Sequence, residues 1–262
     1  MASRASIVIL SHRPELLGAA VASALAQTVP VHVMVQHDRD AWPGKLNQIV
    51  AASVKEWIIP LCDDDLLDPR YVERCLFFSQ DADIVFTDRK GFGPGVVSWW
   101  KPWTWMRARP ATGLRHQMFG PQVAAFIGTD AARVTLDPGT FAFGQPLPMT
   151  AMIRRSWWTQ LGGYDDAIPH ADTEFWFRSV KGGARVVYVP EPLFWYRYHS
   201  GQLSAQRPSM MEALRAFHRK HFADFGHAYP TAKPLSGTEL QVDIISPDDR
   251  AEYARTHFRG AA

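Results

Sequence analysis

Cysteine, net charge and long apolar runs are all scarce in this sequence of 262 residues. The two cysteines, Cys62 and Cys75, are too few for a disulfide framework and lack the close pairing of a zinc site, so we expect both to be reduced core residues. Lysine and arginine exceed aspartate and glutamate by 28 − 26 = 2, which gives no general electrostatic reason to bind nucleic acid or an anionic membrane. No apolar run approaches about 18 residues, so we expect no membrane-spanning helix.

The N-terminus lacks the pattern of a secretory signal. It leads into the short apolar run 7–10 without the longer apolar region and small-residue cleavage site of a signal peptide, so we expect a cytoplasmic protein. Hydrophobic residues make up 47% and charged residues 21% of the chain, a composition that excludes wholesale disorder.

Strand-like and helix-like segments alternate through the first 90 residues. Short runs rich in β-branched and aliphatic residues are predicted strands, at 7–10, 31–35, 57–61 and 83–87. The stretches between them have helical spacing apart from a loop at 42–44, and are predicted helices at 14–26, 45–53 and 69–79. Such alternation predicts an α/β fold with a mostly parallel sheet flanked by helices, in which ligands bind beyond the carboxyl ends of the strands.

The second half of the chain is less regular. Periodicity breaks down over about 91–147, an insert rich in glycine, proline and tryptophan that we expect to be partly looped. The segments that follow are predicted to be a strand and short helix within 151–163, a helix over 173–181 and a strand over 185–189.

A C-terminal helical extension is predicted over 205–262. Its apolar stripe at helical spacing comprises Met210, Met211, Leu214, Phe217, His221, Phe222 and Phe225. A last helix is expected from the Ser-Pro-Asp-Asp sequence at 246–249 to about Phe258. The stripe is typical of a helix that packs on the core, and a surface for a partner is the alternative.

Three consecutive carboxylates, Asp63, Asp64 and Asp65, follow the predicted strand 57–61. Adjacent carboxylates repel one another, and a hard divalent cation bound through one or two of them, with a nucleotide diphosphate supplying further oxygens, would relieve that repulsion. The alternative is a solvated acidic turn that caps the helix expected near Pro69.

The order strand, acidic triplet, proline and helix resembles the metal-binding turn of the family 2 glycosyltransferases, which have the GT-A fold. Further segments resemble the same family in the same order, so that the resemblance covers about residues 5–204. They are the strand and turn at 7–14, Lys45-Leu46-Asn47, the Gly-Gly-aromatic-Asp segment 162–166, and the Tyr-Arg-x-His segment 196–199 with Ser204. The resemblance implies a GT-A domain over 1–204, with a Rossmann-like nucleotide-binding half, that transfers a sugar with inversion from a nucleotide diphosphate sugar to an acceptor hydroxyl.

The resemblance also implies a set of donor-binding and metal-binding residues. Those expected to contact the donor are Ser11, His12, Arg13, Gln36, Asp38, Lys45, Asn47, Asp63, Asp64 and Arg197. Those expected to hold Mn²⁺ or Mg²⁺ are Asp64, Asp65 and His199. Two alternatives stay open: His199 could be an ordinary polar residue, and Asn47 could cap its own helix.

The resemblance defines the nucleobase of the donor nucleotide less well. The family usually has two aspartates after the second strand, whereas this chain has Gln36-His37 with Asp38 displaced by one residue. We expect a uridine nucleotide, because the family uses one most often, and leave dTDP- and GDP-sugars open.

The catalytic base is expected at the start of the helix near 173. In the family an acidic pair opens this helix and an arginine follows six residues after the second acid. Counting back from Arg178 gives Asp172, with Ala171 in place of the first acid and Glu174 as the reserve. A carboxylate there would take the proton of the acceptor and be kept ionised by the helix dipole. The alternative is that Asp172 only caps the helix.

Acceptor contacts are expected from four residues, Trp103, Trp105, Asp166 and Trp176. Four of the ten tryptophans fall within 99–105, where they could stack on sugar rings, lie at a membrane interface or pack as core. The acceptor itself could be a glycan, a protein, a lipid-linked saccharide, a modified base or a small metabolite. Ala171 and Gln36-His37 also leave open a degenerate module that binds nucleotide sugar or glycan without turnover.

Overall fold

The computed structural model describes residues 2–37, 42–93, 131–136, 141, 147–168, 171–202, 207–222 and 240–244. Three predicted site residues, Asp38, Trp103 and Trp105, lie outside these ranges, as do most of the tryptophan-rich insert and the last predicted helix.

The first half of the chain alternates between strands and helices, as predicted. Its elements are β1 (Ala5–Ser11), α1 (Pro14–Leu25), β2 (Val31–His37), α2 (Trp42–Ala51), β3 (Trp57–Cys62), β4 (Leu66–Leu67), α3 (Tyr71–Phe77) and β5 (Ile84–Phe92). Helix α2 begins three residues earlier than predicted, because Trp42 packs against the ring of Tyr164 and Pro43 is buried. The 42–44 segment is therefore helix and not loop.

The second half contributes strands and helices from more distant parts of the chain. They are β6 (Ala132–Leu136), β7 (Met152–Arg154), α7 (Arg155–Gln160), α8 (Ala171–Lys181), β8 (Val186–Arg197), α9 (Arg207–His221) and β9 (Leu240–Ile244). The segment expected to be a helical extension therefore contains a strand. Residues 240–244 read Leu-Gln-Val-Asp-Ile, which has the alternation of a strand, and β9 pairs antiparallel with β6.

The strands form one mixed sheet of the α/β class. Its order is β2-β1-β3-β7-β5-β8-β6-β9, with β4 paired to β8. Strand β1 is parallel to β2 and β3, and β5 is parallel to β8, whereas the short β7 runs antiparallel between β3 and β5. Strand β8 extends to Arg197, beyond its predicted end, because it pairs with β5 past an irregularity at Asp88 and also with β4.

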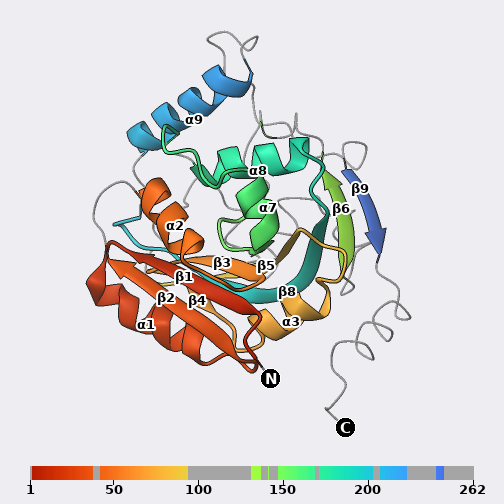
Figure 1. Ribbon diagram of the computed structural model, residues 1–262. Coiled ribbons are helices and arrows are strands. Elements are labelled where there is room, and N and C mark those ends of the chain that lie inside the picture. Colours follow the sequence, from red (N-terminus) through yellow and green to blue (C-terminus); the bar gives the residue numbers. More distant parts are fainter. Residues whose placement is uncertain are drawn as a thin grey trace.

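Helices cover both faces of this sheet (Figure 1). Residues of α2, α7 and α8 form one buried cluster with the sheet, and residues of α1 and α3 form the other. In β1, Ile7 and Ile9 belong to one cluster and Val8 and Leu10 to the other. Burial on both faces explains why this strand is a continuous apolar run instead of an alternating one. Of the helices described, none is long and apolar enough to cross a membrane.

Helix α9 lies beside α8 (Figure 1) and packs on it through aromatic side chains. Phe217 has no exposed surface, and its ring meets that of Phe177 edge to face at 5.6 Å between centroids. The part of the predicted stripe whose side chains the structure describes thus faces the core.

This packing predicts that Phe217→Ala lowers the free energy of unfolding by about 3–5 kcal/mol, because a large ring is removed from a filled space. Chemical denaturation of both proteins measures the change. Leu25→Ala, at a side chain that is 66% exposed, is the control and should stay within about 0.5 kcal/mol of the wild type. A similarly small effect at Phe217 would show that α9 is not part of the cooperative core.

Candidate functional site

The carboxyl ends of β1 and β3 lie side by side, because Leu10 pairs with Cys62. Asp63, which follows β3, binds the segment that follows β1. Its buried carboxylate accepts hydrogen bonds from the backbone N–H groups of His12 and Arg13, both at 2.6 Å, and from two nitrogens of the Arg13 guanidinium at 2.9 and 2.6 Å. These four bonds match the about four acceptor positions of a carboxylate. Asp63 is therefore committed to holding the strand ends rather than free to contact a donor.

Asp64 and Asp65 contact cationic and polar groups that follow β1 and end β8. The Asp64 carboxylate lies 2.8 Å from a guanidinium nitrogen of Arg13 and 3.0 Å from Nε2 of His199. Arg197 donates its backbone N–H to Asp65 at 2.9 Å and its Nε–H to the backbone oxygen of Asp64 at 2.7 Å. The fold thus brings together the residues that the sequence predicted as a metal and diphosphate site.

The electrostatics of this cluster favour a cation. One ligand atom each from Cys62, Asp64 and Asp65 lies within 4.8 Å of the others. Burial and, next, the charge of Asp64 raise the pKa of the Asp65 carboxyl well above its usual value, and burial and the same carboxylates raise the pKa of the Cys62 thiol. The hydroxyl of Ser11, buried at the end of β1, has no hydrogen-bond partner in the described part of the chain. The two carboxylates of this group fit Mn²⁺ or Mg²⁺, which prefer oxygen ligands, whereas the thiol of Cys62 does not.

Three further residues were predicted to bind the donor: Gln36, Lys45 and Asn47. Gln36 is half-buried on β2 opposite Leu10, and Lys45 is half-buried in the first turns of α2. Asn47 neither caps its helix nor points its amide away from the protein. The amide donates to the backbone oxygen of Tyr164 and accepts from its N–H, both at 2.8 Å.

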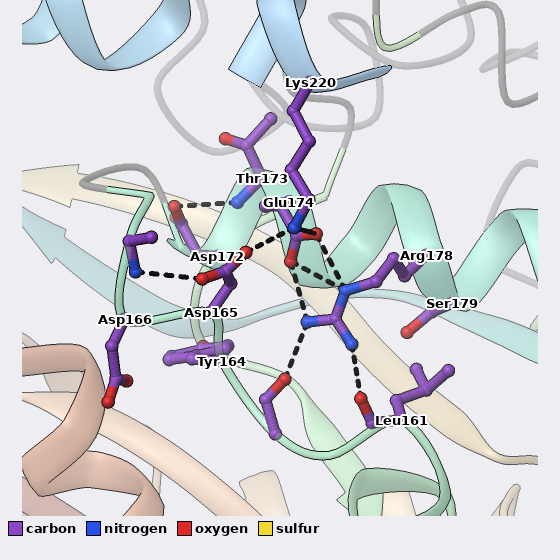
Figure 2. Close-up of polar contacts among 12 residues, drawn as sticks. Leu161, Tyr164, Asp165, Asp166, Asp172, Thr173, Glu174, Arg178, Ser179 and Lys220 are labelled. Carbon is purple, nitrogen blue, oxygen red and sulfur yellow. Dashed lines mark hydrogen bonds and ion pairs between the residues drawn. The ribbon is translucent and has the colours of Figure 1, made fainter. Parts of the chain in front are cut away.

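Asp172 lies in the first turn of α8 and is half-buried. Its Oδ1 accepts the backbone N–H of the next residue, Thr173, at 2.8 Å (Figure 2). This local bond leaves both the base and the capping interpretation of Asp172 as predictions.

Glu174 is buried and ion-paired within the protein. Its fully buried carboxylate accepts from Arg178 at 2.7 Å, Lys220 at 3.2 Å and His221 at 3.1 Å. Although burial raises the pKa of Glu174, the hydrogen bonds and charges of Arg178 and Lys220 outweigh it and lower the pKa. The reserve assignment of Glu174 as catalytic base is therefore wrong, because a buried carboxylate that is ion-paired on α8 and α9 cannot reach an acceptor.

Arg178 also binds the backbone of the turn that precedes α8. Its guanidinium donates to the backbone oxygens of Leu161 at 2.6 Å and Gly163 at 2.7 Å (Figure 2). Lys220, from α9, bridges Asp165 and Glu174. The sequence used Arg178 only to locate Asp172 and gave no sign of Lys220, whose partners are 46 and 55 residues away.

Two predicted acceptor contacts can be placed. Trp176 is wrong as an acceptor contact, because it has no exposed surface and packs against Phe175 in the core. Asp166 points toward α2 (Figure 2), where Asn47 donates to it at 3.3 Å. Its carboxylate also lies 2.8 Å from where a side chain on Gly44 would begin.

Comparisons with known proteins agree with this geometry. Residues 7–136, about half of the chain, match the family described as Glycosyl transferase family 2. No curated protein matches the chain. Solved structures with a similar fold include Staphylococcus aureus TarS 1–349 in complex with UDP-GlcNAc, at TM-score 0.58 and 12% identity over 83% of this chain and 66% of that one.

The TarS 1–349 complex with UDP has TM-score 0.55 and 13% identity, over 82% of this chain and 65% of that one. Mannosyltransferase PcManGT from Pyrobaculum calidifontis, in complex with GDP-Man and Mn²⁺, has TM-score 0.55 and 11% identity, over 87% of this chain and 66% of that one. The chain therefore spans slightly less than two thirds of these proteins, and at such identities the likeness shows the fold.

The Gly-Gly turn predicts unequal effects of two adjacent substitutions. Gly162 and Gly163 both have positive φ, +76° and +73°, so an alanine at either is strained by about 1–2 kcal/mol. A Cβ at Gly163 would also overlap Oδ1 of Asn47, whereas a Cβ at Gly162 meets nothing within 4 Å. Denaturation should show Gly163→Ala to be the more destabilising by at least about 1 kcal/mol; equal losses would contradict the close approach of Asn47.

Glu174 predicts a pH dependence of stability. Because its pKa is lowered in the folded state, its contribution is present above the unfolded pKa of about 4.3 and is lost as pH falls through the folded value. Glu174→Gln should lower the free energy of unfolding by about 3 kcal/mol at pH 7. Denaturation from pH 7 to 3 should show this difference narrowing below about pH 4. A constant difference would mean that Glu174 is not ionised in the fold.

Proposed function

The chain belongs to glycosyl transferase family 2, and on that premise we propose that it is an inverting, metal-dependent transferase that moves a sugar from a nucleotide diphosphate sugar to an acceptor hydroxyl. One observation carries the proposal. It is the acidic strand end, where Asp64 and Asp65 lie beside His199 and Arg197. Asp172, half-buried at the start of α8, supplies a carboxylate for the role of base.

The residues divide the work by their chemistry. Asp64 and Asp65, with His199, would hold Mn²⁺ or Mg²⁺, which stabilises charge on a departing diphosphate. Arg13 and Arg197 place two further positive charges at the same strand ends, where they favour an anionic donor. Asp172 takes the proton of the acceptor hydroxyl as the new bond to the anomeric carbon forms.

A uridine diphosphate sugar is the proposed donor. The usual donor of the family supports it, and the TarS structures hold UDP and UDP-GlcNAc, whereas the PcManGT structure holds GDP-Man with Mn²⁺. The acceptor is proposed only as a hydroxyl compound, since Trp103 and Trp105 lie outside the described residues.

A module that binds the donor without turnover is the second candidate. Ala171 favours it, because a fully buried alanine stands where the family has the first acid of its pair. This candidate predicts donor binding with neither transfer to an acceptor nor hydrolysis.

The proposal predicts that Asp172→Asn lowers the rate of donor turnover by about 10²–10⁴-fold, because an amide cannot accept the proton. Release of nucleotide diphosphate from UDP-glucose, UDP-N-acetylglucosamine and GDP-mannose measures the rate. The affinity for the nucleotide diphosphate with Mn²⁺ should stay within about twofold.

Asp81→Asn is the matched control, since Asp81 is exposed between α3 and β5 and should turn over the donor as the wild type does. An undiminished rate in Asp172→Asn would remove Asp172 as the base. Binding without any turnover by the wild type would favour the second candidate.

A further inference from the structure

The thiol of Cys62 is the one ligand group of the cluster with Asp64 and Asp65 that the proposed function leaves unused. Cys62 is half-buried at the end of β3, whereas the other cysteine, Cys75, has no exposed surface and packs in the core. The Sγ atom of Cys62 and one carboxylate oxygen each of Asp64 and Asp65 lie within 4.8 Å of one another. At this spacing one ion can bind all three groups.

A second sulfur atom lies beside this thiol. Cys62 donates a hydrogen bond to Sδ of the half-buried Met149 at 3.3 Å, although the two residues are 87 positions apart in the chain. Thiolate and thioether sulfurs are soft ligands, which the hard ions Mn²⁺ and Mg²⁺ bind poorly. This side of the cluster therefore favours a different class of ion from the one that the two carboxylates favour.

The ligand types of this cluster suit Zn²⁺. Zn²⁺ binds thiolate, imidazole and carboxylate groups, and a tetrahedral site that supplies all four ligands leaves no position open. An imidazole is at hand, because Nε2 of His199 lies 3.0 Å from the carboxylate of Asp64. Zn²⁺ also stands above Mn²⁺ in the general order of affinity of divalent ions for a given site. The donor set of a closed zinc site is thus present in Cys62, Asp64, Asp65 and His199.

We propose that Cys62 makes the acidic strand end a site for Zn²⁺, and that Zn²⁺ held by these four side chains blocks the Mn²⁺-dependent binding of the donor. As the bond between zinc and sulfur forms, the thiol releases its proton to water, and nothing is oxidised. The blocking rests on the proposed function, because it requires a donor diphosphate that depends on the same carboxylates. Cys62 is then a residue that selects the ion and not a catalytic residue.

The first test uses Cd²⁺, a thiophilic probe whose bond to a thiolate gives an ultraviolet charge-transfer band that a site of oxygen ligands lacks. Titration of the wild type with Cd²⁺ should produce this band, and Cys62→Ser should abolish it. Cys75→Ser is the matched control and should keep the band, because Cys75 is buried in the core. Since the chain has only two cysteines, the pair of variants identifies the ligand.

The second test is calorimetric. Cys62→Ser should lower the affinity for Zn²⁺ at least about tenfold, because one soft ligand is lost. The concentration of Zn²⁺ that halves the Mn²⁺-dependent binding of UDP or GDP, whichever the wild type binds, should rise by at least about the same factor. Circular dichroism shows whether each variant is folded, and Cys62→Ala is used if the serine prevents folding.

Three results would overturn the zinc site: no thiolate band in the wild type, the same band in Cys62→Ser, or an affinity for Zn²⁺ that Cys62→Ser leaves unchanged. Failure of the proposed function would look different. If the wild type gave the Cys62 band but bound no nucleotide with Mn²⁺, the zinc site would stand and the donor site would be refuted. If the wild type bound a nucleotide with Mn²⁺ and Zn²⁺ left that binding unchanged, the donor site would stand and the blocking by Zn²⁺ would be refuted.

Discussion

The buried carboxylate of Asp63 is the constraint on which the rest of the site depends. By accepting two backbone N–H groups and the guanidinium of Arg13, it fixes the end of β1 against the end of β3. Arg13 then also reaches Asp64, and the end of β8 approaches from the other side through Arg197 and His199. Two neighbouring carboxylates are thus held close together despite their repulsion, which is the arrangement that a divalent cation stabilises.

A second buried carboxylate, that of Glu174, holds the start of α8 and the turn before it. Glu174 and Arg178 form an ion pair within α8, and Arg178 extends it to the backbone of the Gly-Gly turn. Lys220 adds α9 to this network (Figure 2), so a helix from the C-terminal part of the chain helps to position the turn and the start of α8. Removing one partner of such a buried pair is far more costly than its presence is stabilising, which makes the position of Asp172 well defined.

Much of the fold and the composition of the site could be predicted from local patterns. The apolar runs and the acidic triplet located β1, β3 and the strand ends, because strand periodicity and parallel connections are local properties. What a residue does once it is there depends on contacts across 100 or more residues, such as Asn47 with Tyr164 or His199 with Asp64. No local pattern distinguishes Asp63 from Asp64, marks Glu174 as ion-paired or shows Trp176 to be core. The alternation over 240–244 is too short to identify β9 without its pairing with β6.

The central claim is that the strand ends form a metal-dependent nucleotide diphosphate site. The most direct measurement is calorimetric titration of UDP, dTDP and GDP into the wild type and into Asp64→Asn, with and without Mn²⁺. We predict that one diphosphate binds the wild type at least about tenfold more tightly with Mn²⁺ than without it, and that Asp64→Asn removes this difference. Equal affinity with and without Mn²⁺, or no binding of any nucleotide, would contradict the claim and leave the buried acidic triplet with a structural role alone.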